Sequence, residues 1–547
     1  MKIVKNEFYN EPSIKEEVMM KRQDLIAPEW YNIVEEIEKY AQDPSKNALI
    51  VYNDNEEIQY ITYANLLEKA NQAAHVFTSQ GLTKGDVLLV MVPRSVEAYI
   101  VYIAALKAGL TIIPSSEMLR TKDIEYRITH ANAKGIIAYE PYIEQFDDVT
   151  NLKGIMQFVI GHAHAPWQPL LEKMKEHPTN YTNPTPTKST DHAFLAYTSG
   201  TTGNPKAAVH THSWGYAHLR TTAPNWLGVQ ENDIVWATAA PGWQKWIWSP
   251  FLATLGSGAT AFVYKGKFDA STYLSLLEKF KVNVLCCTPT EYRFMATLNN
   301  LQDYNLSAIR QAVSAGEPLN SEVVKVFSKT FHIQVRDGYG QTENTLLVGT
   351  LVGMDARVGS MGKPTPGNTV EIIDDFGNPV ADGVVGDIAV HRQTPALFKK
   401  YFKDPERTSM QFRGDWYITG DRAYKDADGY FWFEGRGDDV IISSGYTIGP
   451  FEVEDALMKH PTVKEAAVVA SPDEVRGNIV KAFIVLREGV TGDDTLIQNL
   501  QNHVKLMTAP YKYPRAIEFV EALPKTASGK IRRVELRQQE KAHYTHQ

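Results

Sequence analysis

Short apolar segments alternate with helical segments from about residue 48 to about residue 340. The run VLLVMV at 87–92 predicts a buried strand, the stretch 95–109 predicts a helix that ends on a glycine, and 110–114 predicts the next strand. Further strands are expected at 194–197, 234–237, 260–264, 282–286 and 335–338, with helical patterns between them. Repeated strand–helix–strand units indicate parallel or mixed sheets covered by helices, so we expect an α/β fold.

The 547-residue chain is too long for one hydrophobic core, because single cores stop growing at about 250–300 residues. After about residue 365, turn signals crowd between short strands, which predicts a small antiparallel β subdomain over about 365–435. A new pattern of helices and strands from about residue 450 predicts a compact α+β unit. We therefore expect a large N-terminal domain at 1–435, a hinge at 436–440 and a small, mobile C-terminal domain at 441–547.

Composition narrows the classes of partner. The net charge of -8 disfavours nucleic acid, since phosphate neutralisation needs surplus lysine and arginine. No run of about 18 apolar residues predicts a membrane-spanning helix, and the N-terminal segment lacks the features of a signal or transit peptide. The two cysteines, Cys286 and Cys287, are adjacent and should point to opposite faces of a strand, so no disulfide is expected. We expect a cytoplasmic protein.

The segment 197–206, Tyr-Thr-Ser-Gly-Thr-Thr-Gly-Asn-Pro-Lys, directly follows a predicted strand. Its glycines and hydroxyl side chains allow backbone N–H groups to face a polyphosphate, and Lys206 adds a cation. The spacing is not that of a P-loop, which requires G-x-x-x-x-G-K-[ST]. On composition alone, a flexible surface loop remains the alternative.

Six motifs in collinear order carry a resemblance to the adenylate-forming, or AMP-binding, superfamily of acyl-CoA synthetases, adenylation domains and luciferases. They are TSGTTGNPK at 198–206, SAGEPL at 314–319, GYGQTE at 338–343, YITGD at 417–421, GRGDDV at 435–440 and PKTASGK at 524–530. Together with 443–454 and 509–514, the chain looks most like the medium-chain acyl-CoA synthetase branch. The resemblance implies an enzyme that uses ATP to form an acyl-adenylate and then passes the acyl group to a thiol.

The resemblance also implies how ATP is held. Gly316, Glu317 and Pro318 with Tyr339 would form a flat slot for adenine. Asp421 would accept hydrogen bonds from the ribose hydroxyls, with Arg436 in support. The full implied ATP- and AMP-binding set is Thr198, Ser199, Gly200, Thr201, Thr202, Gly203, Lys206, Gly316, Glu317, Pro318, Asp337, Gly338, Tyr339, Gly340, Gln341, Thr342, Asp421 and Arg436.

Three residues are expected to act on the reacting groups. The resemblance implies that the ammonium of Lys530 bridges the substrate carboxylate and the α-phosphate, that Thr342 donates to the same phosphate, and that Glu343 holds Mg²⁺. Lys530 lies on the small C-terminal domain, which must close for adenylation and then move to admit the thiol. The matching hinge residue is Asp438, and rotation about it would bring the segment 443–449 to the site.

The acid is expected to be larger than acetate. In acetate-specific relatives a bulky aromatic occupies the position of Gly340, so a glycine there implies room for a medium-length, branched or aryl acid. Trp243 resembles the aromatic residue of the acyl pocket, whereas Trp246 and Trp248 fit either the pocket or ordinary core packing. Lys245 is unusual in this aromatic segment, and the sequence leaves open whether it faces solvent or shortens the pocket.

Coenzyme A is the expected acceptor, with the thiol of a carrier protein as the alternative. The residues proposed to meet coenzyme A are Ser444, Gly445, Tyr446, Arg476 and Lys512. Thr447 replaces an arginine that relatives usually carry, so one phosphate contact is in doubt. A third hypothesis, a non-catalytic nucleotide-binding protein, is disfavoured by the intact Lys206, Glu343, Asp421 and Lys530. The expected binding partners are thus small molecules: a carboxylic acid, ATP and coenzyme A. The sequence does not decide between a monomer and a homodimer.

Overall fold

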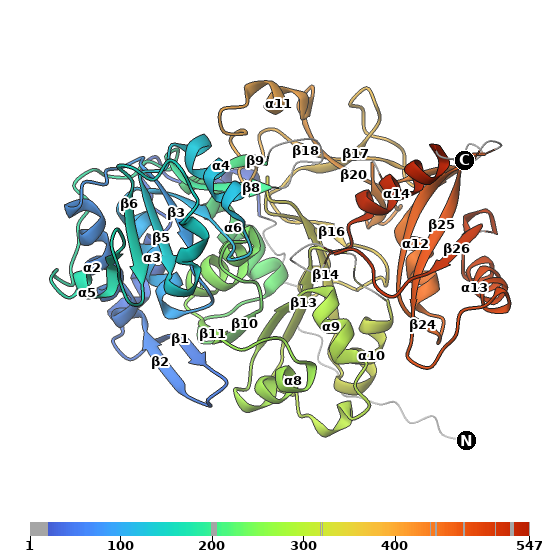
Figure 1. Cartoon of the computed structure of the whole chain (residues 1–547), viewed down its shortest axis with the longest axis horizontal. Coiled ribbons are helices and arrows are strands. Elements are labelled where there is room, and N and C mark those ends of the chain that lie inside the picture. The colour runs from blue at the N-terminus through green and yellow to red at the C-terminus, as the bar shows by residue number, and fades with distance from the viewer. Residues whose placement is uncertain are drawn as a thin grey trace, which may run out of the picture.

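The computed structural model describes residues 20–198, 205–317, 319, 321–437, 439–443, 446–473, 476–508, 510–525 and 530–545. Figure 1 shows two helix-covered sheets in the left and central parts of the molecule, a small β unit at the top and a C-terminal unit on the right. This arrangement confirms the predicted α/β class with its additional antiparallel unit. No helix within the described ranges is long and apolar enough to cross a membrane.

The first sheet has seven strands and is parallel apart from one edge pair. Its order is β7 (Gln168–Pro169), β6 (Met156–Ile160), β5 (Gly135–Tyr139), β3 (Val87–Met91), β4 (Thr111–Pro114), β8 (His192–Thr198) and β9 (Lys206–Thr211). Strand β3 is buried along its whole length, as a continuous apolar run predicts for a parallel strand covered on both faces. The antiparallel register of β8 and β9 sets Thr198 opposite Lys206, so both ends of the segment 198–206 meet at one edge.

The second sheet has nine strands. Its order is β16 (Lys363–Pro364), β15 (Leu346–Gly349), β14 (Val335–Gly340), β13 (Gln311–Ala315), β12 (Val284–Cys287), β10 (Ile234–Ala237), β11 (Thr260–Tyr264), β1 (Asn47–Tyr52) and β2 (Ile58–Thr62). The strands from β14 through β1 run parallel, whereas β2, β15 and β16 are antiparallel additions. Because β13 and β14 are parallel neighbours, Ala315 of the SAGEPL motif lies beside Gly338 of the GYGQTE motif.

Helices cover both sheets, and their sequences explain where they form. They are α1 (Glu35–Glu38), α2 (Tyr63–Ser79), α3 (Val96–Lys107), α4 (Thr121–Ala131), α5 (Leu170–Met174), α6 (His212–Thr222), α7 (Gln244–Trp246), α8 (Ala270–Lys279), α9 (Pro289–Ala296) and α10 (Ser321–Phe331). Helix α3 is apolar on nearly all sides and is buried between the sheets. Its Tyr99 and Tyr102 pack on Trp246, with ring centroids 5.0 Å and 4.8 Å apart, which joins the two sheets through one aromatic core.

The small β unit is antiparallel throughout, as predicted. It contains β17 (Val370–Ile373), β18 (Gly386–His391), β19 (Phe412–Arg413), β20 (Trp416–Lys425) and β21 (Phe431–Arg436), with α11 (Pro405–Met410) beside it. The β20–β21 register pairs Asp421 with Arg436, so residues of two separate motifs become neighbours. Arg436 therefore ends a strand of this unit.

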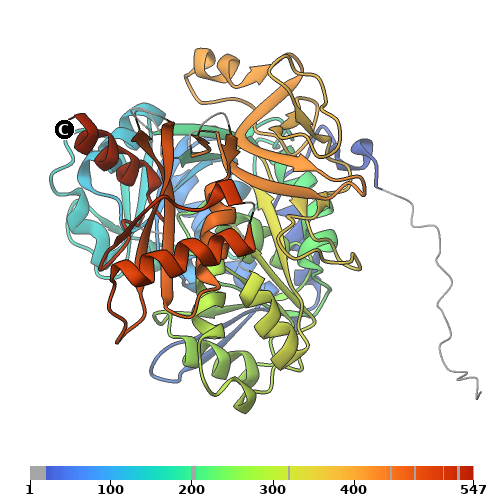
Figure 2. The ribbon, with the colours of Figure 1, turned by 90° about the vertical axis from the view of Figure 1, so that its right-hand side faces the viewer.

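The C-terminal unit is a three-stranded sheet with a hairpin and three helices. Its elements are β22 (Ile441–Ser443), β23 (Tyr446–Ile448), α12 (Pro450–Met458), β24 (Val463–Asp473), β25 (Gly477–Leu486), α13 (Asp494–Met507), β26 (Ala516–Phe519) and α14 (Arg533–Thr545). In Figure 2 this unit, in orange to red, lies in front of the other sheets. Its own buried residues, among them Val453, Leu457, Val468 and Leu500, form a separate hydrophobic core.

Candidate nucleotide and acyl site

Asp421 is the centre of a buried hydrogen-bonded cluster built from three motifs. The Tyr339 hydroxyl and the Gln341 side-chain amide both donate to Asp421 Oδ2, at 2.6 Å and 2.7 Å. The other oxygen, Oδ1, lies 3.6 Å from Arg436 Nε. Burial raises the pKa of Asp421, which is 6% exposed, while Arg436 and the two donors oppose that rise. Oδ2 of Asp421 thus accepts two hydrogen bonds, whereas Oδ1 faces Arg436.

Lys206, Tyr401 and Glu343 form a second cluster. Lys206 Nζ lies 3.0 Å from Glu343 Oε1 and donates to the Tyr401 hydroxyl at 2.6 Å. The same hydroxyl donates to Glu343 Oε1 at 2.8 Å. Burial, with the nearby Glu343 carboxylate, raises the pKa of Tyr401, so the phenol stays protonated and can donate. The buried carboxylate and the lysine neutralise one another.

Tyr401 is a site residue that the sequence analysis missed. It belongs to none of the six motifs and lies between the small β unit and the first sheet. An isolated antiparallel bridge joins Tyr401 to Ala208, which follows Lys206 by two residues in β9, and this bridge brings Tyr401 to the site. A tyrosine between lysines, in the run Lys399–Lys403, carries no local signal of this role, so only the long-range pairing could reveal it.

The ends of β13 and β14 provide the floor of the site. Gly316 has φ of 109°, a conformation that favours glycine, and follows β13 directly. Asp337 Oδ1 accepts from the backbone N–H of Gly338 at 2.9 Å, and burial raises the pKa of Asp337 to about 7. Glu317 Oε2 accepts from the Thr290 hydroxyl at 3.2 Å. Adjacent strands thus supply two carboxyl groups to one edge.

Lys530 reaches this floor from the C-terminal unit. A Cβ placed on Gly316 would lie 3.7 Å from Lys530 Nζ, so the ammonium sits directly above the glycine. The residue is exposed to solvent, but protein atoms packed around its ammonium lower the pKa of Lys530, an effect that Glu317 opposes. Asp455, which is 3.4 Å from the Ser321 hydroxyl, makes a second contact across the same junction.

The aromatic segment at 243–248 divides into exposed, core and site-facing residues. Trp243 is 37% exposed, whereas Trp246 lies in the core beside α3. Trp248 approaches β14, since a Cβ on Gly340 would lie 3.0 Å from its Cη2. The same Cβ would lie only 2.3 Å from Thr345 O, so close backbone packing alone requires glycine at 340.

Lys245 faces the aromatic interior rather than solvent. Its Nζ is 4.6 Å from the Trp226 ring centroid and 5.6 Å from that of Trp248, within cation–π range. The ammonium is buried and makes no hydrogen bond with any residue in the described part of the chain. Of the two alternatives that the sequence left open, the structure thus supports the inward one.

The residues expected to meet coenzyme A divide into two places on the C-terminal unit. Tyr446 stacks on Tyr511 at a centroid distance of 4.4 Å, next to Lys512, which is paired with Glu452. Arg476 lies instead at the turn between β24 and β25. Several predicted site residues lie outside the described ranges: Ser199, Gly200, Thr201, Thr202, Gly203, Pro318, Asp438, Ser444 and Gly445.

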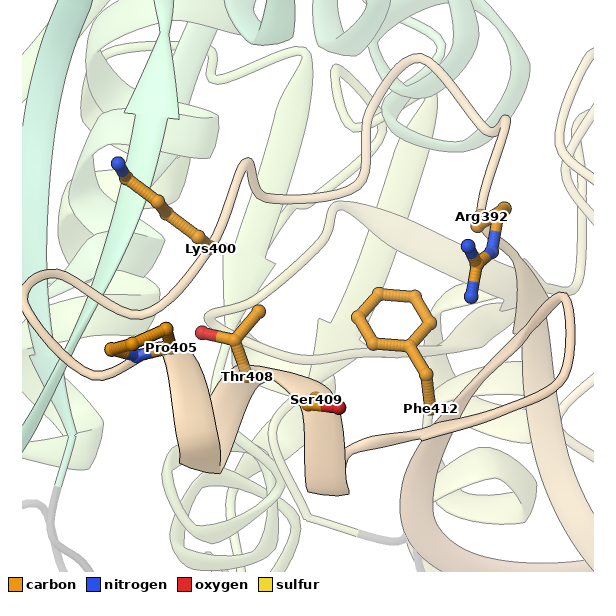
Figure 3. Close-up of a pocket in the computed structure, with 6 residues that line it drawn as sticks. All are labelled: Arg392, Lys400, Pro405, Thr408, Ser409 and Phe412. Carbon is orange, nitrogen blue, oxygen red and sulfur yellow. The ribbon is translucent and has the colours of Figure 1, made fainter.

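A cavity of about 390 Å³ lies beside α11 (Figure 3), and its lining residue Thr408 accepts a hydrogen bond from Tyr401 N at 3.0 Å. It is lined by Arg392, Lys400, Pro405, Thr408, Ser409 and Phe412. None of the predicted site residues contributes to its wall. The cavity is therefore not the candidate site, and Arg392 in its wall is paired with Asp415 at 3.3 Å.

Comparison with known proteins agrees with the geometry. The AMP-binding enzyme family matches residues 37–402, and the AMP-binding enzyme C-terminal domain matches residues 452–530. The chain is 60% identical to an uncharacterized acyl–CoA ligase, YtcI, of Bacillus subtilis (strain 168), over 95% of this chain and 98% of that protein. It is 40% identical to the mitochondrial acyl-coenzyme A synthetase ACSM3 of Rattus norvegicus, over 94% of this chain and 91% of that protein.

Among solved structures, the anthranilate CoA ligase AuaEII in complex with anthranoyl-AMP is similar to this chain with a TM-score of 0.89 and 29% identity. That similarity covers 96% of this chain and 100% of the ligase. Both family matches, the relatives over nearly their full length and this structural likeness agree. The chain belongs to the AMP-binding enzyme family.

Proposed function

We propose that this chain is an AMP-forming acyl-CoA ligase. It activates a medium-length, branched or aryl carboxylic acid with ATP and transfers the acyl group to coenzyme A. The observation that carries the proposal is the convergence of Lys530, Asp421 and the Lys206–Glu343 pair around the ends of β13 and β14. The CoA ligases and synthetases among its relatives, one with a bound aryl-adenylate, support this reaction class.

The nucleotide would bind along the edge of the second sheet. Adenine would lie between the Gly316–Glu317 backbone and the Tyr339 ring, with the Asp337 carboxyl as an acceptor for its amino group. The ribose hydroxyls would donate to Asp421 Oδ1, because Oδ2 already accepts two hydrogen bonds. The triphosphate would then extend toward the end of the segment 198–206 and Lys206.

Adenylation forms a bond between a carboxylate oxygen and the α-phosphorus and expels pyrophosphate. Two anions meet in this step, and the ammonium of Lys530 would lie between them and reduce their repulsion. Thr342 would donate a hydrogen bond to the α-phosphate. Lys206 would exchange its partner Glu343 for phosphate oxygens when the nucleotide binds. Its positive charge would then remain paired with a negative charge.

The donor set also fits Mg²⁺. This ion prefers oxygen ligands and is commonly held by one or two carboxylates together with substrate phosphates. Glu343 supplies one buried carboxylate beside the phosphate-facing lysine, in a position that Tyr401 orients. When bound, Mg²⁺ would neutralise phosphate charge.

The thiol step would require the C-terminal unit to turn about the segment 436–440, with Asp438 as the hinge residue. The N-terminal domain would then be 1–435 and the moving domain 441–547. Coenzyme A would meet Ser444, Gly445, Tyr446, Arg476 and Lys512. We further propose a cytoplasmic location and leave a homodimer as an alternative to a monomer.

The test is a panel of straight, branched and aryl acids, assayed for AMP release with and without coenzyme A. We expect coenzyme A-dependent AMP release with acids larger than acetate and an acyl-CoA product by mass spectrometry. AMP release that depends on a purified acyl-carrier protein instead of coenzyme A would contradict the proposed acceptor. Preference for acetate over the whole panel would contradict the proposed acid class.

A further inference from the structure

Three buried aromatic side chains stack at the junction of β9 and α6. His210, Trp214 and His218 are spaced four residues apart, and each is at most 1% exposed. The ring centroids of His210 and Trp214 are 4.7 Å apart, and those of Trp214 and His218 are 5.1 Å apart with an interplanar angle of 10°. We call these three residues the His–Trp–His ladder.

Each member of the ladder bonds to a different residue of the loop between β14 and β15. His210 Nε2 donates to Thr342 O at 2.6 Å, and Trp214 Nε1 donates to Asn344 O at 3.0 Å. His218 Nδ1 accepts from the Thr345 hydroxyl at 2.6 Å. The two other residues of the loop are also bonded: Phe398 N donates to the carbonyl of Glu343 at 2.6 Å, and the Gln341 side-chain amide donates to Asp421 Oδ2 at 2.7 Å. The loop that carries Thr342 and Glu343 is therefore held at every residue.

The bonds also determine which ring nitrogens carry protons. A carbonyl only accepts, so His218 Nε2, at 2.8 Å from Trp248 O, must carry the hydrogen and Nδ1 must accept. The same reasoning assigns the hydrogen of His210 to Nε2. Burial lowers the pKa of His210 to about 4 and that of His218 to about 3, so both rings are neutral at pH 7. A neutral imidazole in one tautomer makes directional hydrogen bonds, which an apolar side chain in the same position could not make.

His218 extends the network to the acyl side of the site. Its Nε2 bonds the carbonyl of Trp248, whose ring lies against Gly340. Thr345, on the other side of His218, also contacts the Thr222 hydroxyl at 3.0 Å. One imidazole thus joins the phosphate-side loop to the aromatic segment expected to wall the acyl pocket.

We propose that the His–Trp–His ladder is the positioning element for adenylation: it holds Thr342 and Glu343 in register with the phosphates and, through Trp248, with the acyl group. Its members touch no substrate and act through the loop. This inference rests on the proposed function for the identity of the reaction. Simple packing would not require three directional bonds to a single five-residue loop.

His210 offers the sharpest test because glutamine can imitate its single donor. His210→Met replaces the ring by an unbranched side chain of similar length and removes the donor to Thr342 O, whereas His210→Gln can place an amide N–H at the position of Nε2. We expect His210→Met to lower kcat of acid-dependent ATP–pyrophosphate exchange by about 10- to 100-fold. KM for ATP and for the acid should stay within about threefold, and His210→Gln should recover most of kcat.

His212 provides a matched control in the same segment. It is also fully buried and neutral, but its Nδ1 accepts from Ile33 N at 3.2 Å, and it does not contact the loop. His212→Met should therefore lower the melting temperature about as much as His210→Met while leaving kcat unchanged. Equal loss of kcat in the two methionine variants, or no recovery in His210→Gln, would overturn the positioning role.

A second variant keeps the test decisive if His210→Met does not fold. Trp214→Phe retains a stacked ring but removes the N–H that bonds Asn344 O. We expect a similar fall in kcat at nearly constant KM, and full kcat in a folded Trp214→Phe would refute the ladder. Wild-type protein that shows no exchange with any acid would instead count against the proposed function.

Discussion

Replacing Asp421 by asparagine removes one acceptor from the expected ribose site and disturbs little else. Oδ2 accepts from Tyr339 and Gln341, and the asparagine carbonyl can take both bonds if it occupies that position. The amide nitrogen then replaces Oδ1, which faces Arg436 at 3.6 Å. The variant therefore loses the negative charge and the lone pairs that would accept a ribose hydroxyl, while its donors keep a partner.

The size of the effect follows from the charge of the acceptor. A hydrogen bond to a charged group contributes about 1.5–3 kcal/mol, which is about 10- to 150-fold in kcat/KM. Removing the hydroxyl from the substrate should have the same cost in the wild type. In the Asp421→Asn variant that second loss should nearly vanish, because the bond is already absent. The two changes should thus be strongly non-additive.

The assay compares ATP with 2′-deoxyATP and 3′-deoxyATP in acid-dependent AMP formation, for the wild type and for Asp421→Asn. We expect at least one deoxynucleotide to lose about tenfold or more with the wild type and no more than about threefold with the variant. An equal loss in both proteins would refute the assignment, since it would mean that Asp421 does not contact the ribose. Matching melting temperatures would show that the variant keeps its fold.

Four further predictions address other residues. Lys530→Ala should abolish adenylation but keep thioester formation from supplied acyl-adenylate, and equal loss of both half-reactions would contradict the proposed rotation. Tyr401→Phe removes a hydrogen bond from each of two charged partners and should lower the free energy of unfolding by about 1–3 kcal/mol in chemical denaturation, and an unchanged free energy of unfolding would contradict the stabilising role of the hydroxyl. Because the pKa of Asp337 is about 7 and its ionised form accepts better, KM for ATP should fall from pH 6 to pH 8, and Asp337→Asn should flatten that profile. Gly340→Ala should impair activity with all acids, because its Cβ would lie 2.3 Å from Thr345 O, and a selective shift toward short acids would favour the pocket interpretation instead.

Local pattern predicted the architecture well because side-chain period reports directly on which face of an element is buried. The apolar run at 87–92 became the buried strand β3, and the crowded turns after residue 365 became the antiparallel unit. The collinear motifs also indicated Asp421, Tyr339 and Gln341 as nucleotide residues, and the structure joins these three by hydrogen bonds. Their roles toward ATP stay predictions that the assays above can test.

By itself, then, the sequence determined the fold class and the motif residues that surround the sheet edge. The tertiary structure decided what depends on contacts between distant segments: the entry of Tyr401 into the Lys206–Glu343 pair, and the inward direction of Lys245. It also decided the ladder, whose bonds span about 130 positions of the chain. Hydrogen bonds between distant segments do not change the pattern of apolar residues along the chain. A buried histidine therefore has the same sequence pattern whether it packs in a core or bonds to a loop. Only the packed chain shows which residue each donor meets.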